Sequence, residues 1–172
     1  MAETAATEPG LAPAMSPEPV LSRHSYEASI FLVPLDGRAR TALAGTVLGS
    51  PASEHLSGIT VAPPGLPGWD DGQLAKAADE ADMVITLSYD LGQVDAGVVA
   101  RLDRAAHDAG AALGSVIIAP DRRWTEPDAQ RGAVAIREAS DTVVVLGDLA
   151  PAIAFLQVLR GGSRVSASKA GV

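Results

Sequence analysis

The chain has 172 residues, which is enough for one domain with an ordinary hydrophobic core. It contains no cysteine, which excludes disulfides, thiolate catalysis and cysteine-ligated zinc. The formal charge of −8 argues against nonspecific nucleic-acid binding, because phosphate contacts require clustered lysine and arginine. Apolar residues make up 47% of the sequence but aromatic residues only 3%, so small aliphatic side chains must supply the core. Such side chains favour the close helix-on-sheet packing of layered α/β folds.

The two ends of the sequence predict disordered tails around one domain. Residues 1–25 are rich in proline and glutamate and have no hydrophobic periodicity, so we expect a solubilising tail or, alternatively, a docking segment around Leu21. Two glycines, Gly161 and Gly162, predict the end of the last helix and a second tail over 162–172. The start does not resemble a signal peptide, and no apolar run approaches the roughly 20 residues of a membrane helix. We therefore expect one cytoplasmic α/β domain over residues 26–161 that does not contact a membrane.

Strand and helix patterns alternate between the predicted tails. In chain order they predict a strand over 28–33, a helix over 38–48, a strand over 58–62, a helix over 70–80, a strand over 83–87, a helix over 94–109, a strand over 113–119, a helix over 128–139, a strand over 142–146 and a helix over 151–159. The strand runs are continuously apolar, which is typical of strands buried on both faces. The pattern predicts a three-layer Rossmann-like α/β domain with a mostly parallel sheet.

Ligands of such sheets bind beyond the carboxyl ends of the strands, where several polar residues of this sequence fall. The candidate ligand-binding residues are Asp36, Ser88, Asp90, Gly92, Asp95 and Gly97. No Walker A or G-x-G-x-x-G pattern is present, and the first strand leads into Pro34, which has no N–H for a phosphate. Two interpretations stay open for the loop over 88–97: a phosphate or Mg²⁺ site, or an ordinary loop in which Asp95 caps the next helix.

Several strand-end aspartates could converge as an acid–base or metal group, but aspartate also collects at helix caps; they are Asp36, Asp90, Asp95, Asp121 and Asp148. We predict no catalytic residue, no resident metal ion and no cofactor. The segment Arg122-Arg123-Trp124 could anchor a protein partner, because tryptophan and arginine dominate interface hot spots. The alternative is that Trp124 folds over the edge of the domain and both arginines are solvated.

Residues 81–161 resemble part of the GTPase domain of the tubulin/FtsZ family. Ala81 to Ile85 resembles the strand before the family's glycine-rich phosphate loop, and Tyr89 to Gly97 falls where that loop lies. Ser140 to Asp148 resembles the strand that leads to the family's P-N-D turn, and Ala154 to Gly161 is similar to the family's central helix. The resemblance implies a nucleotide-binding α/β fold.

The departures from this family concern its nucleotide-binding segments. Only Gly92 and Gly97 remain of the phosphate-loop glycines, and Val94 and Ala96 replace both threonines. The segment that carries the family's hydrolysis-activating aspartates has no counterpart in the sequence. We therefore expect a noncatalytic scaffold or interaction module, a pseudo-GTPase that acts on a protein partner. The alternatives are an enzyme that binds a nucleotide or other small molecule through strand-end aspartates, and a subunit or maturation factor of a larger enzyme. A homo-oligomer formed through an edge strand also stays open.

Overall fold

A fully parallel five-stranded sheet forms the centre of the fold in the computed structural model, which describes residues 27–47, 59–63, 68–121 and 124–161. Both predicted tails lie outside these residues. The strands are β1 (Ile30–Pro34), β2 (Ile59–Val61), β3 (Met83–Ser88), β4 (Ala112–Ile118) and β5 (Thr142–Leu146). Their order is β2-β1-β3-β4-β5, and each neighbouring pair is parallel. Parallel pairing follows from the alternation of strands and helices along the chain, because each crossover helix returns the chain to the same end of the sheet.

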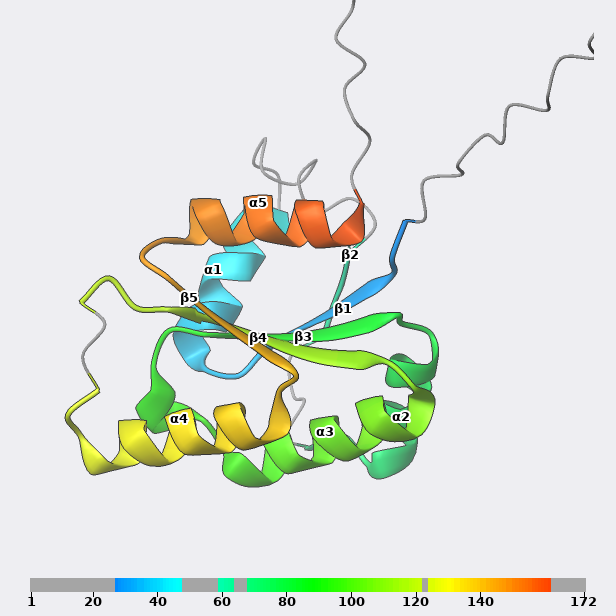
Figure 1. Ribbon diagram of the computed structural model, residues 1–172, viewed down its shortest axis with the longest axis horizontal. Helices are drawn as coiled ribbons and strands as arrows, with labels where there is room; N and C mark the ends of the chain where they lie inside the picture. The colour runs from blue at the N-terminus through cyan, green and yellow to red at the C-terminus, as the bar shows by residue number, and fades with distance from the viewer. Residues whose placement is uncertain (1–26, 48–58, 64–67, 122–123, 162–172) are drawn as a thin grey trace, which may run out of the picture.

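Helices cover the sheet in two layers (Figure 1). They are α1 (Gly37–Val47), α2 (Asp71–Asp79), α3 (Ala96–Ala109), α4 (Pro127–Ala139) and α5 (Leu149–Arg160), with a 3₁₀ turn η3 (Leu91–Gln93) before α3. Helices α1 and α5 form the α1/α5 layer, drawn above the sheet, and the other three form the α2–α4 layer below it. The structure thus confirms the predicted three-layer Rossmann-like α/β domain.

Alternate strand residues build two separate cores, because successive side chains of a strand point to opposite faces of the sheet. The core under the α1/α5 layer includes Leu32, Ile85 and Val116. The core over the α2–α4 layer includes Phe31, Val84 and Ile117. The predicted continuous apolar runs therefore supply both cores from the same strands.

Carboxylates set the starts of several helices. The Asp70 side chain accepts from Gln73 N at 2.8 Å, and the Gln73 side chain accepts from Asp70 N at 3.0 Å, which completes a capping box before α2. Helix α3 begins two residues later than predicted, because Asp95 caps it after the η3 turn. Helix α5 begins two residues earlier than predicted, because Asp148 is its N-cap. Pro151 therefore lies inside the first turn, where no helical hydrogen bond needs its missing N–H.

The prediction of burial on both faces is correct for the inner strands and wrong for the two edge strands, β2 and β5, since Thr60 of β2 is also exposed. All five residues of β1 are buried, whereas Thr142 is exposed and the remaining residues of β5 are half-buried. Strand β5 is an edge strand, paired only with β4, so its side chains have fewer neighbours. Among the described residues, no helix is long and apolar enough to cross a membrane.

Candidate functional site

The carboxyl ends of β1 and β3 meet where the strand order reverses. Strand β2 lies on one side of β1, and β3, β4 and β5 follow on the other side. Ligands of doubly wound sheets bind in the crevice at this reversal, because the connecting loops diverge there to opposite faces. The structure brings Asp36, Ser88 and Asp90 together at this point, as the hydrogen bonds below define.

Asp36 is the centre of this site, and only 1% of its surface is exposed. One carboxylate oxygen, Oδ1, accepts from Ala39 N at 2.8 Å and so caps the first turn of α1. The other, Oδ2, accepts from Ser88 Oγ at 3.0 Å, Tyr89 N at 2.6 Å and Asp90 N at 3.1 Å. A buried carboxylate requires such donors, and these four satisfy it. Asp36 therefore joins the loop after β1 to the loop after β3.

The other predicted carboxylates also accept from backbone amides of the loop over 88–97. Asp90 Oδ1 accepts from Gly92 N at 3.0 Å, and its Oδ2 accepts from Gln93 Nε2 at 2.9 Å. Asp95 Oδ1 accepts from Gly97 N at 2.8 Å and from Val98 N at 3.3 Å. With the two amides that Asp36 binds, four amides of this loop and that of Val98 just after it donate to carboxylates of the chain itself. These are the kind of donors that a phosphate would need.

Helix α4 packs directly on this loop. Leu91 is only 2% exposed, and Val94 packs against the core of the α2–α4 layer. A Cβ on Gly132 would lie 2.1 Å from Leu91 O, so only glycine allows this close approach. Sequence reasoning missed Gly132, although a glycine inside a helix costs stability and is itself a signal of close packing.

Tyr89 and Arg38 form the exposed side of the site. The Arg38 guanidinium lies over the Tyr89 ring, 4.8 Å from its centroid, which suits a cation–π contact. Burial raises the pKa of the Tyr89 hydroxyl above its ordinary value. Arg38 lowers that pKa, whereas the carboxylates of Asp148 and Asp36 raise it. The phenol therefore stays neutral at physiological pH.

The strand-end aspartates are distributed rather than gathered. Asp95 caps α3, Asp148 caps α5 through Leu149 N, and Asp121 is exposed after β4. Within the described ranges, no group of three His, Cys, Asp or Glu side chains could hold a metal ion. The contacts at this edge are those of helix caps and of a junction between two loops.

The predicted partner segment is described only in part. Arg122 and Arg123 lie outside the described residues. Trp124 is half-buried and packs against the core of the α2–α4 layer, and its carbonyl accepts a long hydrogen bond from Gln130 Nε2 at 3.4 Å. This packing of Trp124 agrees with the alternative in which the indole folds over the domain edge.

A cavity of about 390 Å³ lies away from this site, between α2 and the β1–β2 edge of the sheet. Its walls include Phe31 and Trp69, whose rings stack with centroids 6.1 Å apart. Lys76 and Glu80 from α2 also line it. The Trp69 carbonyl accepts from Arg101, which also binds Asp71 at 2.7 Å, so this wall is fixed to α3.

Comparison with known proteins adds no relative. No protein-family profile matches the chain, and no curated protein matches it. The resemblance of residues 81–161 to the tubulin/FtsZ family therefore stays a prediction, and the geometry above is the basis for function.

Proposed function

We propose that this chain is a noncatalytic, cytoplasmic interaction module that acts on a protein partner through its surface. In this proposal it is a pseudo-GTPase of the tubulin/FtsZ type whose nucleotide site has been lost. The observation that supports it most is that backbone amides of the loop over 88–97 are already hydrogen-bonded. Its amides donate to Asp36, Asp90 and Asp95, the carboxylates of the same site.

Electrostatics support the same conclusion. A phosphate bound at this loop would have to displace the chain's own carboxylates and would then lie beside them. The phosphate and these carboxylates are all negatively charged, so they would repel each other. The buried Asp36 carboxylate would also lose the hydrogen-bond donors that satisfy it. Leu91 and α4 also occupy the space beside the loop. A ligand would therefore have to replace existing contacts before it formed its own.

Isothermal titration of the full chain with GTP, GDP, ATP and NAD in the presence of Mg²⁺ tests the proposal. We expect no saturable heat at millimolar ligand. Asp36→Asn is the informative variant, because it removes the negative charge but leaves an oxygen that can still accept from the loop amides. We expect it to bind no nucleotide either. Micromolar binding of any of the four ligands by the unaltered chain would contradict the proposal.

A second candidate function is binding of a small molecule at the α2 cavity. The observation that favours it is the combination of a stacked aromatic wall with one cation and one anion, Lys76 and Glu80. Such a lining suits a small zwitterion with an apolar group, such as an aromatic amino acid. Trp124→Phe leaves Trp69 as the only tryptophan, so its fluorescence can be followed while free aromatic amino acids are added. Lack of any saturable change with these amino acids would remove this candidate.

A further inference from the structure

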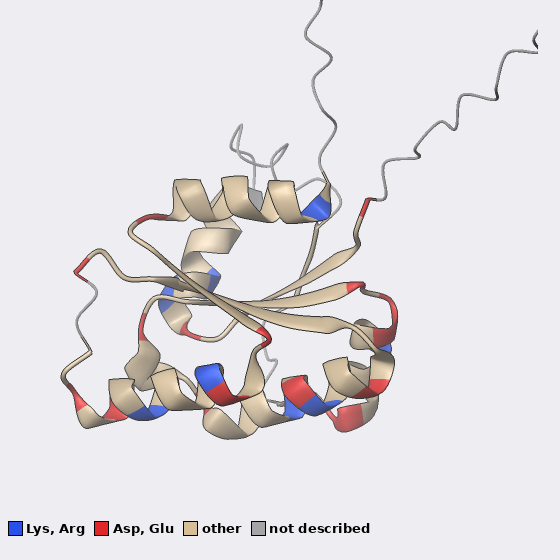
Figure 2. Ribbon diagram, viewed as in Figure 1, with Lys and Arg blue, Asp and Glu red and all other residues tan. Residues whose placement is uncertain are grey.

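Helix α5 exposes a face without charge. The helix has no charged residue before Arg160, its last residue. Ala150, Pro151 and Ala154 are exposed, and Val158 is 76% exposed, the largest exposure of a large hydrophobic side chain in the described part of the chain. Figure 2 shows this helix without charge colour up to its blue end, with a red segment before it; the N-cap is Asp148 and the last residue is Arg160. A helix that is apolar on all sides is expected to be covered on all sides.

The surrounding surface indicates what covers this face. Each helix of the α2–α4 layer carries both acidic and basic side chains, and the whole chain has a net charge of −8. Two copies of such a chain repel each other least through the face that lacks carboxylates. The uncharged α5 face is therefore the favoured contact between identical acidic chains.

Charge at the ends of α5 favours an antiparallel pair. Asp148 precedes the helix and Arg160 ends it, and Ala154 lies six residues from each. A two-fold axis at Ala154 places the acidic start of one helix beside the basic end of the other, twice in each dimer. The same axis sets Val158 of one copy against Ala150 of the second copy, so a large side chain meets a small one.

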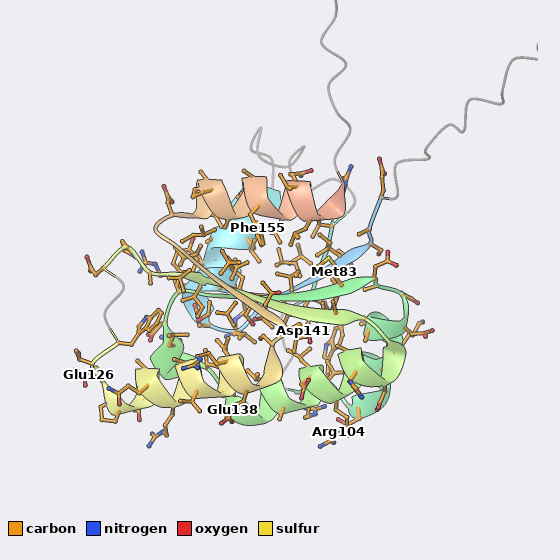
Figure 3. The ribbon with its side chains drawn as sticks, viewed as in Figure 1. Met83, Arg104, Glu126, Glu138, Asp141 and Phe155 are labelled. Atoms are coloured by element: carbon orange, nitrogen blue, oxygen red, sulfur yellow. The ribbon has the colours of Figure 1, made fainter. Side chains whose placement is uncertain are left out.

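The open edge strand β5 fits a second copy less well. Asp141 and Asp148 bracket the strand in the sequence, and Figure 3 labels Asp141 beside the start of the strand. Antiparallel pairing of β5 about Val144 would bring Asp148 of one copy beside Ser140 and Asp141 of the second copy. Like charges across a strand pair are destabilising. Pairing through β5 therefore has repulsive ends, whereas the α5 pair has attractive ends.

We propose that the chain forms a two-fold dimer through antiparallel packing of the exposed face of α5. The partner of the proposed interaction module is then a second copy of the chain. This choice of partner is the only point at which the dimer rests on the proposed function. Dimerisation is measured without nucleotide, so failure of this proposal and failure of the nucleotide proposal are separate results.

Sedimentation equilibrium of the full chain over a range of concentrations is the first test. We expect a reversible monomer–dimer equilibrium with a dissociation constant in the micromolar range. Val158→Lys should raise this constant by about a hundredfold, because each dimer would bury two unpaired ammonium groups. Val134→Lys is the matched control, because Val134, 51% exposed on α4, is the other large exposed hydrophobic side chain among the residues that the structure describes. It should leave the constant unchanged.

Cross-linking tests the geometry without adding charge. The chain has no cysteine, so Ala154→Cys introduces a single thiol at the proposed two-fold axis. We expect it to form a disulfide-linked dimer under mild oxidation, whereas Ala100→Cys, exposed on α3, should remain largely monomeric. A full chain that stays monomeric at all concentrations would overturn the proposal. So would a dimer that is unaffected by Val158→Lys and does not cross-link through Ala154→Cys, because it would use another face.

Discussion

The two faces of the sheet differ in polarity both inside and outside the protein. Within the described ranges, the buried polar side chains of the strands all lie on the α2–α4 side: Thr86, Ser88 and Ser115. The opposite face contributes hydrocarbon side chains to its core. Outside, Glu138 and Arg104 lie on the α2–α4 layer, whereas α5, which carries Phe155, has no charged residue before Arg160 (Figures 2 and 3). Specific polar contacts therefore position the α2–α4 layer, whereas the side of α5 that packs on the sheet contributes hydrocarbon side chains.

This difference explains why the candidate site and the candidate interface lie in different layers. The loop over 88–97 and α4 belong to the polar side. Hydrogen bonds to Asp90 and Asp95 hold the loop, and α4 meets it through the close approach of Gly132 to Leu91 O. Helix α5 belongs to the apolar side, where hydrophobic contacts are not directional and can be continued by a second molecule. Polar contacts therefore fix the position of the loop at the candidate site, whereas the apolar face of α5 offers surface on which a second molecule can pack.

The largest effect expected from breaking this pattern is at Asp36. We expect Asp36→Ala to lower the free energy of unfolding by about 3–4 kcal/mol, because four donors lose a buried acceptor and α1 loses its cap. Asp148→Ala is the comparison in the apolar layer, where the side chain caps α5 at an exposed position, and it should cost about 1 kcal/mol. Urea denaturation of both variants measures the difference. Equal losses would show that Asp36 is no more than a helix cap.

A pair of glycine substitutions compares the two helix layers directly. Gly132→Ala would place a Cβ within 2.1 Å of Leu91 O, so we expect it to destabilise the protein. The expected cost is about 2–3 kcal/mol, because a backbone atom rather than a movable side chain must shift. A Cβ on Gly45, in α1, meets nothing within 4 Å. Gly45→Ala should therefore stabilise the protein by about 0.5–1 kcal/mol. Thermal unfolding of the two variants should shift in opposite directions, and a harmless Gly132→Ala would mean that α4 can move off the loop.

The buried hydroxyls on the polar side give a smaller effect. Ser115 Oγ lies 2.6 Å from Thr86 Oγ1 and 2.7 Å from Ser140 Oγ, which links β3, β4 and the C-cap of α4. Ser115→Ala should cost about 1–2 kcal/mol, because both neighbours lose a partner. The double variant Ser115→Ala/Thr86→Val should lower the free energy of unfolding by less than the sum of the two single changes. The reason is that Thr86→Val removes a hydroxyl that Ser115→Ala alone leaves without its partner. Additive losses in urea denaturation would contradict this coupling.

The smallest expected effect is on the ionisation of Tyr89. Burial raises the pKa of its hydroxyl and Arg38 lowers it, so Arg38→Ala should raise that pKa further. Because the folded-state pKa lies above the ordinary value of 10.0, the contribution of Tyr89 to stability is complete below pH 10 and is lost as the pH rises through the folded-state pKa. Tyr26→Phe leaves Tyr89 as the only tyrosine, and tyrosinate absorbance then follows its titration. Arg40, two residues after Arg38 on α1, supplies the control: Arg40→Ala should change the titration of Tyr89 little.

The sequence alone predicted the elements and their alternation. Continuous apolar runs placed the strands. Asp70 was expected at the start of a helix, and a cap role for Asp95 was one of two open interpretations; the structure places both as N-caps. These features are local, because periodicity and capping depend on residues a few positions apart. The candidate residues Asp36, Ser88 and Asp90 were also predicted correctly to lie at one edge, because parallel strands end together.

Only the tertiary structure decided what these residues contact. Asp36 is 52 residues from Ser88 in the sequence. The hydrogen bond that Asp36 accepts from Ser88 therefore depends on the pairing of β1 with β3. Gly132 matters only because α4 crosses Leu91, and β5 is half-exposed only because it is the last strand of the sheet. The apolar outer face of α5 is likewise decided by which side packs on the sheet. Local sequence fixes what a segment can form, whereas burial and partnership depend on distant segments that meet only in the folded chain.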